Sequence, residues 1–173
     1  GTASVRAGVF SSEGKLKAQG VEPISLFRPR ENFVEQSSEN IWQATTKAIK
    51  KAIKRAKINP RFIKGIGFDA TCSLVALGTK DQPVSISPTG DNKHNIIVWM
   101  DHRAIREATE INRTKSQVLK YVGGSISPEM EIPKLLWLRK NLNRQYKKIK
   151  KFFDLADFMV YRATGNEIRS CLL

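Results

Sequence analysis

The sequence has few cysteines, no long apolar run and few acidic residues for its number of basic ones. Only Cys72 and Cys171 occur among 173 residues, neither in a C-x-x-C pair, and His94 and His102 lack ligand spacing to them. We therefore expect neither a disulfide framework nor a metal site. No apolar run approaches the ~18 residues that cross a bilayer, and the start lacks the basic and apolar regions of a secretion signal. These absences predict a cytoplasmic protein without membrane contact.

The shortage of acidic residues gives a net charge of +14, from 30 Lys and Arg against 16 Asp and Glu. Such a balance raises the alternative of a module that binds nucleic acid or another polyanion. Half of the basic residues form two clusters: Lys47, Lys50, Lys51, Lys54, Arg55, Lys57, Arg61 and Lys64, then Arg139, Lys140, Arg144, Lys147, Lys148, Lys150 and Lys151. The first cluster lies opposite apolar residues at helical spacing and has no interleaved aromatic residues to stack on bases. It is therefore typical of a solvated helix face, and nucleic acid is not the favoured partner.

Length and composition fit one α/β domain with a core. The expected elements are a hairpin of residues 5–10 and 15–24 closed by a turn at 11–14, strands at 63–69, 72–77, 96–100 and 152–155, and helices at 39–57, 103–122 and 132–142, with a last helix that ends at Gly165. Ser38 is the expected cap of the first helix. Residues 81–95, with two prolines, read as a loop.

Two segments carry residues suited to ligand chemistry. The turn of Gly1, Thr2 and Ser4 before a strand can offer hydroxyl and N–H donors to phosphate, although such a turn is more often only a turn. Asp101, His102 and Arg103 follow an expected strand, where α/β folds commonly face a ligand. The alternatives are a helix N-cap for Asp101, a structural hydrogen bond for His102 and a structural ion pair for Arg103. Cys72 has no visible base partner that would make it a nucleophile, and Trp99 and Trp137 read as core.

Six motifs in sequence order resemble those of one enzyme family. The start (residues 1–10) resembles the G-T-x-S-x-R phosphate hairpin of actin-like kinases, and residues 35–44 resemble an E-Q … W-Q-A stretch of xylulose and related kinases. Residues 67–75 (G-F-D-A-T-C-S-L-V), 99–104 (W-M-D-H-R-A), 133–138 (P-K-L-L-W-L) and 153–165 (F-D-L-A-D-F … A-T-G) are similar to motifs of the FGGY carbohydrate kinases. The resemblance covers nearly the whole chain, and W-M-D-H-R-A favours the ribulokinase-like, pentulose kinase subgroup over glycerol kinases.

The resemblance implies an RNase H-like (actin-like ATPase) domain with a mixed sheet and flanking helices. Residues 1–173 would be an N-terminal FGGY domain that is incomplete at both ends. The implied reaction transfers the γ-phosphoryl group of ATP, with Mg²⁺, to a hydroxyl of a ketopentose such as D-ribulose or of a related polyol. The alternatives are the polyanion module and a non-catalytic homologue.

The resemblance also assigns residues. Gly1, Thr2, Ser4 and Arg6 would lie near the phosphates, and the sugar would contact Thr71, Cys72, Ser73, Asp101, His102, Arg103, Glu129 and Met130. The leading Asp of the hairpin motif would precede Gly1, and the catalytic base, also an Asp, would lie downstream of the chain. We therefore expect the 173 residues alone to be inactive, with a sugar or polyol and ATP as partners and a homodimer as the assembly to test.

Overall fold

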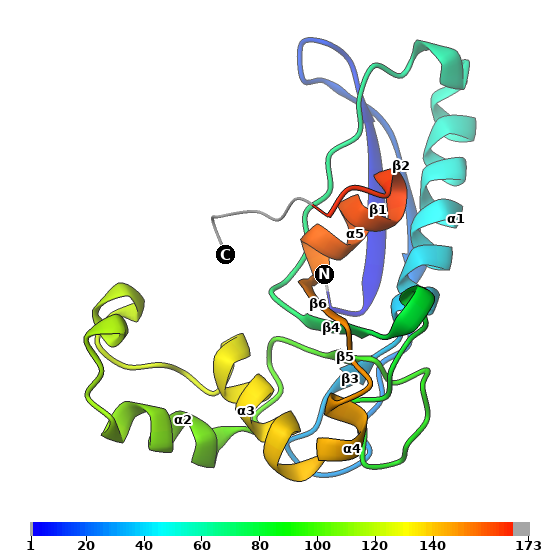
Figure 1. Ribbon diagram of the computed structural model, residues 1–173. Helices are drawn as coiled ribbons and strands as arrows, with labels where there is room; N and C mark the ends of the chain where they lie inside the picture. Colours follow the sequence, from blue (N-terminus) through cyan, green and yellow to red (C-terminus); the bar gives the residue numbers. More distant parts are fainter. Residues whose placement is uncertain (1, 168–173) are drawn as a thin grey trace.

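The computed structural model describes residues 2–167 and has an α/β architecture with two separate sheets. In chain order its strands and α-helices are β1 (Ser4–Phe10), β2 (Leu16–Pro23), β3 (Glu35–Gln36), α1 (Ser38–Ala56), β4 (Leu74–Leu77), β5 (Ile96–Ile97), α2 (Ile105–Arg113), α3 (Glu131–Asn141), α4 (Asn143–Tyr146), β6 (Lys151–Asp154) and α5 (Leu155–Thr164). Short 3₁₀ helices lie at η1 (Pro60–Phe62), η2 (Thr79–Asp81) and η3 (Gln117–Val122). Figure 1 shows an L-shaped chain, with the hairpin, α1 and α5 in one limb and α2 and η3 at the end of the other. None of the helices in this described part is long and apolar enough to cross a membrane.

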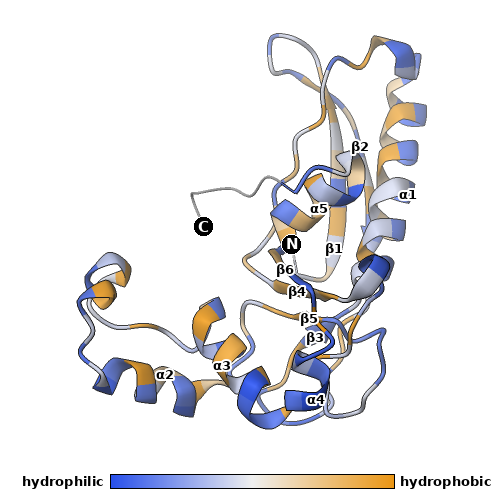
Figure 2. Cartoon of the chain, in the orientation of Figure 1, coloured by the Kyte–Doolittle hydropathy of each residue, from blue (hydrophilic) through white to orange (hydrophobic). Residues whose placement is uncertain are grey.

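The first sheet is the antiparallel hairpin of β1 and β2, which packs against α1 (Figure 1). Hydrophilic and hydrophobic residues alternate along α1 (Figure 2), and its buried face includes Ile41, Ala48 and Ala52. Gly20 of β2 allows this close packing, because a methyl group there would lie 2.1 Å from the backbone oxygen of Ala48. The helix and the hairpin are thus fixed to each other through a backbone contact that no larger residue permits.

The second sheet has the order β3-β5-β4-β6, with every neighbouring pair antiparallel. Successive residues of β4 point to opposite faces, so Leu74 and Val75 belong to different clusters of the core. One face packs against Ile41 of α1 and apolar residues of α5, and the other packs against Leu138 of α3. The sheet is therefore the middle layer between α1 with α5 and α3 with α4, and its strand ends hold the candidate site.

The second limb has a small core of its own, formed by Ala108 of α2, Leu119 of η3 and Ile126. A single helix was expected across residues 103–122, but α2 ends at Arg113 and the chain continues as η3. Lys115 between them has a φ of 51°, which a continuous α-helix does not permit. The closing glycine is confirmed, since Gly123 adopts the left-handed conformation after η3.

Other expectations were only partly right. The hairpin, the first helix and the helix with Pro133 in its first turn are confirmed within one or two residues, but Ser37 and not Ser38 accepts the capping hydrogen bond of α1. The expected strand at 63–69 is wrong: the structure assigns no strand there, and Gly65, Ile66 and Gly67 are exposed. The strand expected at 96–100 is only the two residues of β5, because the chain turns at Trp99 and Met100.

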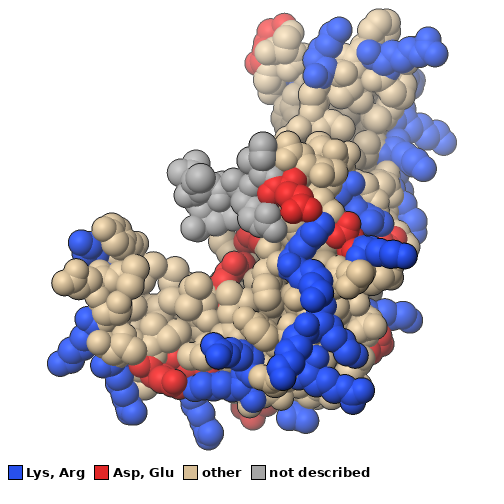
Figure 3. Space-filling model, in the orientation of Figure 1, with Lys and Arg blue, Asp and Glu red and all other residues tan. Residues whose placement is uncertain are grey.

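The basic residues lie where the helical pattern placed them. Lys and Arg side chains gather along the outer face of α1 and around α4 (Figure 3). Lys47, Lys50 and Lys54 of α1 are exposed, while Lys51 pairs with Glu22 of β2. The outer face of α1 is therefore a solvated basic surface, as the sequence predicted.

Candidate functional site

The ends of β4 and β5 bring three of the predicted segments together around Trp99. The Trp99 backbone N–H donates to Oγ of Ser73 at 3.1 Å, and Oγ1 of Thr71 lies 3.4 Å from the same oxygen. The Trp99 indole Nε1 donates to Oγ1 of Thr2, 3.3 Å away in the segment that opens the hairpin. Cys72 is exposed between Thr71 and Ser73. The structure thus joins the predicted sugar-facing segment to the predicted phosphate-facing segment through a tryptophan.

Trp99 was read from the sequence as a core residue, and the structure corrects this. The residue is only half-buried, and its indole N–H donates to Thr2 in the turn before β1. Ser73, in contrast, is fully buried and its hydroxyl accepts the Trp99 N–H, so it supports the site rather than facing it. Period-two alternation in the segment before β4 explains why Cys72 is exposed while Ser73 is not.

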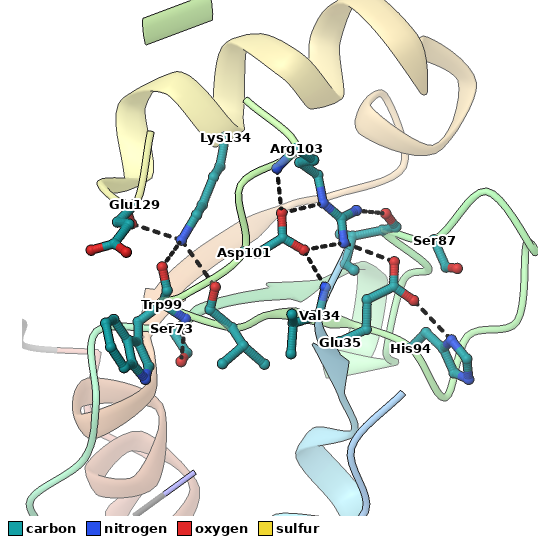
Figure 4. A network of polar contacts seen from close by, with 12 residues as sticks. Val34, Glu35, Ser73, Ser87, His94, Trp99, Asp101, Arg103, Glu129 and Lys134 are labelled. Carbon is teal, nitrogen blue, oxygen red and sulfur yellow. Dashed lines mark hydrogen bonds and ion pairs between the residues drawn. The ribbon is translucent and has the colours of Figure 1, made fainter. Parts of the chain in front are cut away.

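Asp101 and Arg103 form a buried ion pair in place of the ligand-facing pair that the sequence suggested (Figure 4). Asp101 is 0% exposed, and its carboxylate accepts from the backbone N–H of Val34 at 2.6 Å and that of Arg103 at 2.9 Å, besides two bonds from the guanidinium at 2.8 Å. Asp101 also does not cap α2, whose N-cap is Ala104. Neither side chain is open to a ligand. The rule that placed them at a ligand applies to parallel strands, whereas β5 is antiparallel to both of its neighbours.

Glu35 extends this network and was not singled out as a site residue from the sequence. It is fully buried in β3, accepts from Arg103 at 2.8 Å, and contacts Nδ1 of His94 at 2.9 Å. The Arg103 guanidinium also lies 4.2 Å from the ring centre of Phe33 and 5.1 Å from that of Trp137. This enclosure by charges and rings fixes the turn that carries Trp99 and His102.

His102 and Glu129 form a second pair at the open edge of the site. Nε2 of His102 lies 2.8 Å from Oε1 of Glu129, and their side chains are 44% and 40% exposed. Met130 beside them is exposed. Among the predicted sugar contacts, these three together with Thr71 and Cys72 keep atoms available to a ligand.

Lys134 is a second residue of the site that the sequence reasoning did not single out. It is 0% exposed in α3, and its ammonium donates to the backbone oxygens of Val98, Trp99 and Glu129 (Figure 4). Burial lowers its pKa to about 8, against the opposing effect of nearby carboxylates. Its presence inside the P-K-L-L-W-L motif was visible in the sequence, but a lysine in an amphipathic helix is normally assigned to the solvent face.

One turn earlier in α3, Glu131 is also mostly buried. Burial, followed by the charges of Asp154 and Asp157, raises the pKa of Glu131 to about 7. Its Oε1 is buried without a hydrogen-bond partner among the described residues. Glu131 is therefore a carboxyl group that changes charge near neutral pH beside the site.

Two of the residues predicted to face phosphate lie on one side of the hairpin. Alternation along β1 places Ser4 and Arg6 on the same face, Arg6 is exposed, and Thr2 lies in the turn just before the strand. Gly1 lies outside the described residues. Hydroxyl groups and a guanidinium are hydrogen-bond donors of the kind that phosphate oxygens accept from. Within residues 2–167, no group of three His, Cys, Asp or Glu side chains could hold a metal ion.

The sequence and the fold both match known proteins. Residues 1–170 match the N-terminal domain of the FGGY family of carbohydrate kinases. The chain is 46% identical over 171 residues to a human FGGY carbohydrate kinase domain-containing protein and 43% identical over 172 residues to a D-ribulokinase of Saccharomyces cerevisiae. Both alignments cover 98% of this chain. A glycerol kinase of Thermococcus onnurineus is 32% identical over 173 residues.

Among solved structures, a xylulose kinase of Brucella ovis superposes with a TM-score of 0.84 at 22% identity, over 95% of this chain and 32% of that one. The chain likewise spans 31% of the human relative and 24% of the yeast relative. The α/β, actin-like fold expected from the sequence is thereby confirmed.

Proposed function

The chain belongs to the FGGY family of carbohydrate kinases, and we propose that it supplies the sugar-facing wall of an enzyme that phosphorylates a ketopentose, D-ribulose in the first place, with ATP. The similarity to the yeast D-ribulokinase, at 43% identity, supports this substrate over glycerol, whose kinase in Thermococcus is 32% identical. Because the chain spans about a third of the human relative, the complete reaction is assigned to a longer protein.

The observation that carries the proposal is the hydrogen bond from Trp99 to Thr2. Phosphoryl transfer needs the acceptor hydroxyl and the phosphate to meet in one place, since its catalysis is mainly positioning and charge stabilisation. Trp99 belongs to the segment predicted to face the sugar, and Thr2 to the segment predicted to face the phosphates. Their contact supports a single site at which the two ligands meet.

Four of the open residues have a chemical role in this proposal. The half-buried Trp99 ring offers an apolar face to the C–H groups of the sugar, and the Thr71 hydroxyl can donate to and accept from its hydroxyl groups. The exposed His102–Glu129 pair supplies a further donor and acceptor at the outer edge. Ser73 holds the Trp99 backbone, and Asp101 with Arg103 holds the turn beneath it.

On the phosphate side, Thr2, Ser4 and Arg6 are the residues of this chain proposed to hold the terminal phosphates of ATP. Mg²⁺·ATP supplies the phosphoryl group and neutralises its charge when bound. The base that takes the proton of the acceptor hydroxyl is proposed to come from outside residues 1–173.

Calorimetric titration of D-ribulose, D-xylulose and glycerol into the chain tests the substrate assignment, with Trp99→Phe as a conservative variant and Trp42→Phe as its matched control. We expect D-ribulose to bind most tightly, with weaker binding in Trp99→Phe alone. An equal or greater affinity for glycerol would contradict the assignment. A coupled ADP assay of the chain should give no turnover, and the same assay on the protein encoded by the complete gene should give turnover with D-ribulose.

A further inference from the structure

Lys134 is a buried charge to which the proposed mechanism gives no role. Its Nζ donates to the backbone oxygens of Val98 at 3.0 Å, Trp99 at 2.9 Å and Glu129 at 2.7 Å. The first two oxygens belong to the segment that follows β5, and the third belongs to the loop before α3. A single ammonium therefore joins two of the segments that carry the open residues of the proposed sugar site (Figure 4).

Three acceptors match the three N–H groups of a protonated lysine. A neutral amine has only two, so deprotonation leaves one buried carbonyl oxygen without a donor, which is costly in a site closed to water. The charged groups that act on Lys134 are Asp101, Glu131 and Glu129, which favour its ammonium form, and Arg103, which opposes it. Burial outweighs them and lowers the pKa of Lys134 to about 8, so the third donor is lost just above neutral pH.

Loss of this third donor would affect the residues that are proposed to face the ligand. Trp99 is held at three points: its N–H by Ser73, its carbonyl by Lys134 and its indole by Thr2. The backbone of Glu129 is held by Lys134, and its side chain contacts His102. Loss of the hydrogen bond to the carbonyl of Trp99 or of Glu129 would let these two residues move relative to each other.

We propose that Lys134 is a positioning residue, whose ammonium holds the Trp99 segment and the Glu129 loop in the arrangement that the sugar requires. The proposal adds a positioning residue to the sugar site proposed above, and its role in sugar binding rests on that proposed function. Its physical content, a proton on Lys134 that sets the position of Trp99, does not depend on which sugar binds.

Fluorine NMR of the chain labelled with 5-fluorotryptophan tests this content without a ligand. The three resonances are assigned with single Trp→Phe variants and followed from pH 6 to pH 10. We expect the Trp99 resonance to shift with a midpoint near pH 8, and this transition to disappear in Lys134→Met, a substitution of similar size. Trp42 serves as the internal reference, because it lies on α1 and stacks with Arg162 of α5, outside the hydrogen bonds of Lys134. A Trp99 resonance that does not change with pH, or that changes identically in Lys134→Met, would overturn the proposal.

Two neighbouring groups could produce a transition of their own, so each has a control. Glu131, with its pKa of about 7, is removed by Glu131→Gln, and His102 is removed by His102→Gln. The transition of the Trp99 resonance must persist in both, with a lower midpoint in Glu131→Gln, because the charge of Glu131 favours the ammonium form of Lys134. If it vanishes in either, that group and not Lys134 moves Trp99, and the proposal is wrong. These controls also decide the matter if Lys134→Met does not fold.

The affinity for D-ribulose gives the functional readout. We expect the dissociation constant of the wild-type chain to rise about tenfold between pH 7 and pH 9.5, the effect of losing about one hydrogen bond to a charged group. In Lys134→Met, affinity should already be about tenfold lower at pH 7 and should not change further with pH. If affinity in the variant keeps the wild-type pH dependence, Lys134 does not position the wall. If D-ribulose binds at no pH, the substrate assignment fails and the fluorine titration alone decides on Lys134.

Discussion

The substitution Asp101→Asn separates a structural role of this residue from a role in sugar binding. The carboxylate of Asp101 is fully buried and accepts four hydrogen bonds, three of them from Arg103. An amide of the same shape removes the negative charge and turns its NH₂ group toward a donor. Breaking a buried ion pair on one side typically costs about 3–5 kcal/mol, because the remaining charge stays buried without its partner. Glu35 still faces Arg103, so we expect a loss near the lower end of this range, about 3 kcal/mol.

Urea unfolding followed by circular dichroism at pH 7 measures this loss. With a slope of about 2 kcal/mol per molar urea, the midpoint should fall by about 1.5 M. Asp69→Asn is the matched control: Asp69 is exposed, and we expect its free energy of unfolding to change by no more than about 0.5 kcal/mol. If Asp101→Asn unfolds like the control but binds D-ribulose more weakly, Asp101 is a sugar ligand and the structural interpretation is refuted.

Three further predictions concern other parts of the chain. Gly20→Ala should lower the free energy of unfolding by about 1–3 kcal/mol in the same urea assay, because its methyl group would collide with the Ala48 carbonyl and force α1 off the hairpin; an unchanged midpoint would contradict this packing. Glu131 has a folded-state pKa of about 7, above its ordinary 4.5, so the stability linked to its protonation is fully present below pH 4.5 and is lost as the pH rises through 7. Glu131→Gln should therefore be more stable than wild type at pH 8 by up to about 3 kcal/mol and equal to it near pH 4, and a constant difference across this range would refute the assigned pKa. Alkylation of Cys72 by iodoacetamide, followed by mass spectrometry in a Cys171→Ser background, should be slowed by D-ribulose, and an unchanged rate at saturating sugar would place Cys72 outside the site.

The parts of the fold that the sequence predicted well depend on local patterns. The spacing of apolar residues defines α1, and turn residues define the hairpin; in both, the interacting residues lie close in sequence. The strand expected at residues 63–69 failed because an apolar run does not show whether a partner strand exists, and the structure assigns this segment no partner. The length of β5 was overestimated for a related reason, since the turn at Trp99 is stabilised by Ser73 and by Lys134 of α3, both distant in the sequence.

The candidate site was harder to predict, because its network joins distant parts of the chain. Val34 bonds Asp101 across 67 positions, and Lys134 bonds Val98 across 36. No local pattern indicates that a particular carboxylate will find these partners. Family resemblance singled out the segments but not which of their residues are buried, because buried and exposed residues can be equally characteristic of a motif.

Which residues of this segment are buried and which are exposed follows from the path of the backbone between Trp99 and Arg103. Asp101 and Arg103 are buried, while Trp99 and His102 keep exposed surface, so one short turn sends its charged pair inward and its ring systems outward. The inward side holds two acids, Glu35 and Asp101, against two bases, Arg103 and Lys134. Buried ions in such balance rarely add net stability over an apolar core, but they demand one geometry, since each charge must meet its partners. In this chain the required geometry is that of the turn that carries Trp99, so the buried network fixes the shape of the surface that we propose faces the sugar.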